Sequence, residues 1–207
     1  MYALVTDGSI TKTISGNRGI TIGDVQYPQN IFNLWSAAEK EAIGIYEVEF
    51  NNSNKRDENF YINTNQSFNF ADGKVIASYG TATAKLLEDR NEVDEAGEPL
   101  LDEKGNQVVT KGLKSQKKEI IKQQASGLLT PTDWYVIKAT DVAEYNVPSA
   151  VSTFRADVRT KSNEMETAID NASDVDALAT LYEYVNTGTE ENPVMERPLG
   201  EFPILEI

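Results

Sequence analysis

The predicted helices of this chain meet at Leu128-Leu129-Thr130-Pro131-Thr132-Asp133-Trp134-Tyr135. Proline disfavours helical geometry in the residue before it, so we expect Pro131 to hold Thr130 extended and to end an arriving helix near Gly127. A new helix then begins, because Thr132 or Asp133 offers a side-chain oxygen to its first backbone N–H groups. The bulky apolar residues behind this cap supply the surface of that helix.

The longest predicted helix begins at Pro148, which suits a first helical position because its missing N–H would be unpaired there anyway. Apolar residues then recur at spacings of three and four, as on one buried helical face. They are Val151, Phe154, Val158, Met165, Ala168, Ile169 and Ala172. A capping box of Ser173 and Asp176 opens a further apolar face made of Val175, Leu178, Leu181, Tyr182 and Val185. The two faces predict a helical hairpin or small bundle.

Three segments of this region also point to a protein family, through their residues and their order along the chain. They are 128–134, 147–151 and 154–159. They resemble the C-terminal domain of bacteriophage tail fibre assembly chaperones and similar tail-associated proteins, with Thr-Asp-Trp at 132–134 as the most specific match. The likeness spans roughly residues 111 to 182. It implies a protein that binds another tail subunit in the host cytoplasm during assembly, with the virion tail as the alternative location, and it identifies no catalytic residue.

The composition limits the chemistry available to the chain. It has 207 residues, with 19 Lys and Arg against 33 Asp and Glu, so its formal net charge is −14. That charge disfavours nucleic acid and anionic membranes as partners. Cysteine and histidine are absent, which excludes disulfides, cysteine nucleophiles, Ser-His-Asp catalysis and most zinc sites. We therefore expect no enzyme, no cofactor and no metal, although a hydrolase that works with carboxylates alone remains a third reading.

The order of the patterns predicts an α+β protein, with small antiparallel β-rich N-terminal units followed by a C-terminal helical hairpin or bundle. Asp7-Gly8 and Asp72-Gly73 each separate two β-prone runs, which is typical of hairpins, and Ser36 with Glu39 forms a capping box. The predicted ranges are 1–50 for an N-terminal α+β module, 51–87 for a β-hairpin region, 88–112 for an acidic insertion, 113–187 for the helical domain and 188–207 for an extended tail.

The acidic insertion contains two similar octets, 94–101 and 102–109, each an acidic turn followed by two apolar residues. Such a pair predicts a β-hairpin arm or a mobile loop, because repeat architectures need about three units or more. Its carboxylates suit calcium or a glycosidase pair, but no complete calcium-binding loop is present, so solvated turns are the preferred interpretation. The lysine-rich run that follows, 111–122, is interpreted as a solvated helix face rather than a phosphate site.

A partner-binding surface is predicted on the helical domain, because small domains commonly complete their burial against another chain. We expect an exposed apolar strip along Tyr135, Ile137 and Val151. Arg155 and Arg159 flank this strip one helical turn apart, so they can fix the orientation of a carboxylate on the partner. The expected partner is a phage tail fibre or tail protein, with a second copy of the chain as an alternative.

Two large aromatic residues lie on these helices, Trp134 and Phe154. Either can anchor a partner, but their positions on apolar stripes favour a place in the core for both. Beyond the helices, Phe202, Ile204, Leu205 and Ile207 are able to dock as a strand, although the surrounding tail is predicted to be extended.

Overall fold

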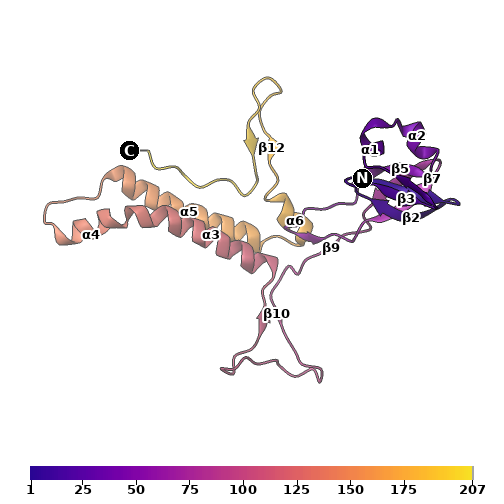
Figure 1. The fold of residues 1–207 in the computed structure, drawn as a ribbon. Helices are drawn as coiled ribbons and strands as arrows, with labels where there is room; N and C mark the ends of the chain where they lie inside the picture. Colours follow the sequence, from indigo (N-terminus) through magenta and orange to yellow (C-terminus); the bar gives the residue numbers. More distant parts are fainter. Residues whose placement is uncertain (207) are drawn as a thin grey trace. The chain divides into compact units, whose positions relative to one another are not determined.

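The computed structural model describes residues 1–206 and has the mixed α+β fold that the sequence predicts (Figure 1). Its contacts divide the chain into two compact units, Met1–Thr83 and Ala84–Ile207. The first unit holds most of the strands, and the second holds the long helices.

The first unit is built on one five-stranded sheet, in the order β2-β1-β5-β8-β7. In its two hairpin turns, Asp7-Gly8 and Asp72-Gly73, both residues have positive φ, as a two-residue hairpin of this type requires. Neighbouring strands are antiparallel except β5 and β8, which are parallel. The strands are β1 (Tyr2–Thr6), β2 (Ser9–Ile14), β5 (Ile45–Asn51), β7 (Ser67–Ala71) and β8 (Lys74–Ser78).

The predicted boundary at residue 50 is wrong, because it falls inside this sheet. The two predicted hairpins form where expected, but β8 of the second one pairs with β5 of the first module. The parallel pairing of Val48 with Val75 places both side chains in one core cluster with Ala3 and Ala77. A periodicity argument finds each strand but not its partner, since pairing depends on contacts far apart in the chain.

Short elements cover a second core in this unit. The capping box is confirmed: the Ser36 hydroxyl accepts from the N–H of Glu39, and the Glu39 carboxylate accepts from the N–H of Ser36. Ile31, Phe32 and Ile45 are buried together behind it. A further hairpin, Ile20–Tyr27, lies in the run that contains Gly16, Gly19 and Gly23, where no hairpin was expected. The elements are β3 (Ile20–Ile22), β4 (Val25–Tyr27), α1 (Ile31–Leu34), α2 (Ala37–Glu41), β6 (Tyr61–Ile62) and, at the boundary, β9 (Thr83–Ala84).

Two long helices lie side by side in the second unit, α3 (Leu113–Leu129) and α5 (Ser149–Asp170) (Figure 1). The predicted stripe of α5 is largely confirmed, since Val151, Phe154, Val158, Met165, Ile169 and Ala172 are buried. Ser162, between Val158 and Met165 on this stripe, is also buried, whereas Ala168 is only partly buried. Lysines of α3 connect the helices: Lys118 pairs with Asp170 and Lys122 with Glu166.

The junction between the helices differs from the prediction. Thr130 is helical rather than extended (φ −52°, ψ −46°), because Pro131 occupies the first turn of a 3-10 helix, Thr130–Thr132, where a missing N–H costs nothing. The helix α4 (Asp133–Asp141) follows directly, and its N-cap Thr132 makes no capping hydrogen bond. Instead the Thr132 hydroxyl donates to the carbonyl of Leu129. The main helix begins at Ser149, with Pro148 as its N-cap.

The predicted capping box of Ser173 and Asp176 is also wrong. Helix α6 (Val175–Thr180) is capped by Asp174, whose side chain accepts from the N–H of Ala177. Val185 does not continue the apolar face of this helix, because it lies in a hairpin of β12 (Val185–Asn186) and β13 (Met195–Glu196) and is half exposed. The predicted boundary at residue 188 falls inside this hairpin.

The acidic insertion is a hairpin arm with a stem of β10 (Arg90–Asn91) and β11 (Val109–Thr110). The two octets fold alike: the Asp94 carboxylate accepts from the N–H groups of Ala96 and Glu98, and Asp102 repeats this pattern. Three chain segments meet next to the stem through a ring of backbone hydrogen bonds. The N–H of Glu92 donates to the Val108 carbonyl, that of Val108 to Leu100, and that of Leu100 to Glu92. The Gln107 amide lies within 2.7–3.1 Å of all three carbonyl oxygens.

Candidate partner-binding site

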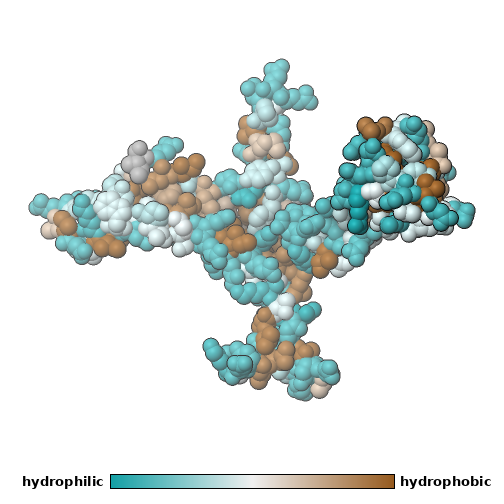
Figure 2. Space-filling view, viewed as in Figure 1, coloured by the Kyte–Doolittle hydropathy of each residue, from teal (hydrophilic) through white to brown (hydrophobic). Residues whose placement is uncertain are grey.

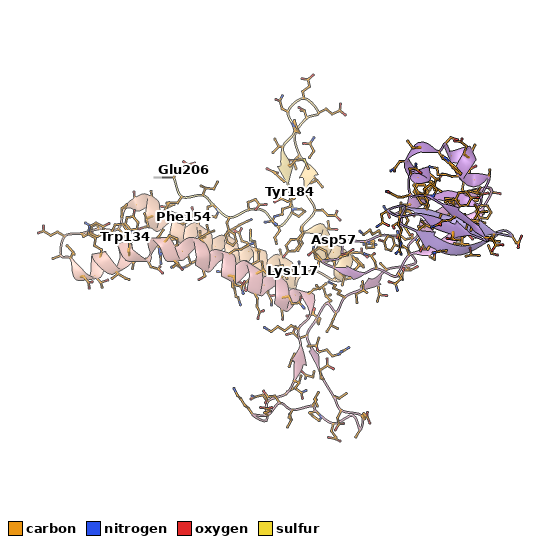
Figure 3. The ribbon with its side chains drawn as sticks, viewed as in Figure 1. Asp57, Lys117, Trp134, Phe154, Tyr184 and Glu206 are labelled. Atoms are coloured by element: carbon orange, nitrogen blue, oxygen red, sulfur yellow. The ribbon has the colours of Figure 1, made fainter. Side chains whose placement is uncertain are left out.

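Helix α4 has no buried residue among its nine. Trp134 is 50% exposed and Ile137 59%, and Val136 is also exposed. The Trp134 ring packs on the Tyr135 ring, with 3.9 Å between their centroids. The Lys138 ammonium lies 5.7 Å from the centroid of the Trp134 ring and 4.3 Å from that of Tyr145. Figure 2 shows hydrophobic surface in the region of α4, and Figure 3 labels Trp134 and Phe154 in the region of the helices. We call Trp134, Tyr135, Val136 and Ile137 the α4 surface.

The cause of this exposure is visible in the sequence. Residues 134–137 are four consecutive bulky side chains. Successive residues of a helix point about 100° apart, so four in a row surround the helix and no single neighbour can cover them all. A run of this kind on a short helix is therefore a signal for an uncovered surface. The expectation that Trp134 lies in the core is wrong, because Trp134 belongs to this run. Phe154 belongs to a stripe with helical spacing and is 6% exposed, as expected.

Arg155 holds the junction together from inside the chain. Its guanidinium donates to the Leu129 carbonyl at 3.0 Å and to the Thr132 hydroxyl, and it pairs with Asp133 at 2.8 Å. Only 12% of its side chain is exposed. Its donors are thus largely directed at the start of α4, so Arg155 positions the α4 surface rather than presenting a free clamp.

Arg159 is the more accessible of the two predicted arginines. It is exposed and donates to the carbonyl of Arg155 at 3.0 Å. It lines an open groove of about 480 Å³ between α3 and α5 that reaches Asp133 at the start of α4. A guanidinium beside hydroxyl and amide groups suits a carboxylate or backbone carbonyls. The other lining residues are Lys122, Ala125, Ser126, Leu129, Thr130, Arg155, Ser162 and Asn163.

Four of the five predicted site residues lie on or beside the α4 surface, and the fifth, Val151, does not. Tyr135 and Ile137 belong to the α4 surface, and Arg155 and Arg159 border the adjoining groove. Val151 is 1% exposed and offers no surface to a partner, because it belongs to the buried stripe of α5. Trp134 and Val136 take its place in the candidate site.

Comparisons with protein-family models, with characterised proteins and with solved structures find no match for this chain. Residues 1–206 contain no group of three or more acidic side chains arranged to hold a metal ion. Within the same residues, no helix is long and apolar enough to span a membrane.

Proposed function

We propose that this chain is a non-enzymatic bacteriophage tail protein that binds a tail fibre or another tail subunit and assists its assembly or attachment. The family comes from the resemblance of residues 111–182 to tail fibre assembly chaperones. The binding surface comes from one observation, that α4 buries none of its side chains and leaves Trp134, Val136 and Ile137 exposed. Exposed apolar groups that stand together mark interaction sites, and tryptophan is enriched among the residues that dominate binding energy.

In this proposal the α4 surface supplies affinity and the groove beside it supplies orientation. Trp134 and Ile137 enter an apolar pocket of the partner, while Arg159 binds a carboxylate or carbonyl at its edge. Arg155 contributes indirectly, because its bonds to Leu129 and Thr132 fix where α4 begins.

Co-expression with a tail fibre protein from the same genome, followed by gel filtration, tests this function. The unmodified chain is expected to elute as a complex. A Trp134→Ala, Ile137→Ala double variant should elute apart from the fibre protein, while its melting temperature stays near that of the parent because both side chains are exposed. Leu34→Ala is the matched control, since Leu34 is 74% exposed in the other unit. A complex that survives the double variant rules out the α4 surface.

A permanent structural or adaptor role in the virion tail is the alternative, because a surface that holds a subunit during assembly can also hold it afterwards. Mass spectrometry of purified virions separates the two. A chaperone leaves the finished particle and is absent from it, whereas an adaptor is present in fixed ratio to the fibre protein.

A further inference from the structure

An extended segment, residues 199–206, runs along the helix pair and covers part of it. Leu199 is its fixed point: the side chain is 2% exposed and its N–H donates to the Leu181 carbonyl. Gly200 follows in the left-handed region (φ +74°), where a Cβ would lie 2.4 Å from the Lys161 Nζ. Beyond this turn, the segment passes beside α5, and Figure 3 shows Glu206 near Phe154.

Two side chains of this segment contact the helices. Phe202 and Leu205 pack against the cluster of Phe154, Val158 and Ala125. Ile204 between them is 85% exposed. The contact therefore follows a pattern of one apolar residue and another three positions later; of the two residues between them, Pro203 is partly buried and Ile204 is directed to solvent.

Apart from these two side chains, few interactions hold residues 202–206 on the helices. Among the described residues, 202–206 donate and accept no backbone or side-chain hydrogen bond. Glu201 is the last residue held by polar contacts, to Tyr184 and to Arg197. An open space of about 410 Å³ also remains between the segment and α3, lined by Gln124, Gly127 and Leu128 of the helix and by Arg197, Glu201, Phe202, Pro203 and Ile204. The helix pair thus holds this segment by two partly buried side chains, and space remains between the segment and α3.

We propose that the apolar surface of α3 and α5 beneath this segment, formed by Ala125, Phe154 and Val158 and called the segment groove, is a binding site for extended apolar peptide segments, and that residues 202–205 are its resident, exchangeable occupant. The ligand class is an extended peptide with large apolar residues three positions apart. Helical ligands are disfavoured, because the resident segment carries Pro203 after Phe202, which holds that residue in extended geometry. The site uses different side chains from the α4 surface, and it does not rest on the tail-protein function.

Binding of a peptide in trans tests the proposal. The probe is a fluorescent peptide with the sequence of residues 199–206, and the receptor is a chain that ends at Gly200. We expect saturable binding to the shortened chain and about tenfold weaker apparent binding to the full chain, because the resident segment occupies the groove there.

Two variant peptides define the contact. Phe202→Ala in the peptide should weaken binding about tenfold, whereas Ile204→Ala should change it less than about twofold, because the Ile204 side chain is exposed. Equal effects of the two changes would contradict the proposed groove.

A second receptor covers the case in which the shortened chain does not fold. The full chain with Phe202→Ala and Leu205→Ala keeps Leu199 and Glu201 in place and frees only the groove, so it should bind the peptide nearly as well as the shortened chain. Failure of both receptors to bind, or failure of both to fold, overturns the proposal, since the segment would then be a permanent part of the core.

Discussion

Phe154 and Trp134 belong to neighbouring helices and have opposite surroundings. Phe154 is 6% exposed in the cluster between α3 and α5, so Phe154→Ala should lower the free energy of unfolding by about 3 to 5 kcal/mol. Trp134→Ala removes an even larger ring but one that is 50% exposed, so its effect should stay within about 0.5 kcal/mol. Urea denaturation measures both. A small effect at Phe154 would place its ring outside the core.

Two glycines make a second matched pair. A Cβ at Gly112 would lie 2.4 Å from the backbone of Glu88, and backbone atoms cannot move aside as a flexible side chain can. Gly112→Ala should therefore destabilise the chain by about 1 to 3 kcal/mol. Gly127 lies inside α3 with nothing within 4 Å of its Cβ position, so Gly127→Ala should stabilise by about 0.5 to 1 kcal/mol. Thermal unfolding of the two variants would contradict this if the order were reversed.

The base of the arm has a pH-dependent contact. The N–H of Gly112 and the hydroxyl of Ser115 donate to Asp89, and they hold the pKa of that carboxyl below its ordinary value of 3.8. Because the folded pKa is the lower one, this stabilisation is fully present above the unfolded value and is lost as the pH falls through the folded value. The melting temperatures of the parent and of Asp89→Asn should therefore differ at about pH 6 and converge at about pH 2. A gap that is constant with pH would exclude this role.

At the scale of elements, the arm meets α3 at its base, where Asp89 accepts from Gly112 and Ser115 and Lys114 pairs with Glu88. The stem and its two turns bury little apolar surface: Val93, Leu100, Leu101 and Val109 are all exposed. Replacing residues 92–108 by a short turn should leave the melting temperature nearly unchanged, because the contacts of Asp89 with Gly112 and Ser115 are retained and shortening a loop has a small entropic effect. Excision of the whole predicted range, 88–112, should destabilise the chain, since it removes these contacts. Calorimetry of both deletions distinguishes these outcomes.

The helix stripe, both hairpins and the capping box of Ser36 were predictable, because each depends on residues close together in the sequence. Features that depend on distant residues were not. The pairing of β5 with β8 and the docking of Phe202 on Phe154 both require knowledge of what lies opposite. At the junction, Pro131 was interpreted as a helix terminator, although proline also fits the first turn of a helix. Part of the candidate site was predictable for the same reason: the run at 134–137 is local, whereas the bonds of Arg155 are not.

At the scale of the whole molecule, the two compact units should fold independently. A fragment of residues 84–207 should give a helical circular-dichroism spectrum and a cooperative melt. A shorter fragment, residues 111–185, should melt at a lower temperature, because it lacks the buried Leu199, Phe202, which packs on the helices, and Asp89, which accepts from the Gly112 N–H at the start of α3. A random-coil spectrum for residues 84–207 would contradict the division.

The central claim is that the protein holds another tail subunit through the α4 surface. Hydrogen exchange of backbone amides, compared between the free chain and its complex with the tail fibre protein, measures this most directly. The account predicts slower exchange across Asp133–Asp141 on binding, with little change in the sheet of the first unit. Unchanged exchange in α4, with slower exchange confined to that sheet, would contradict it.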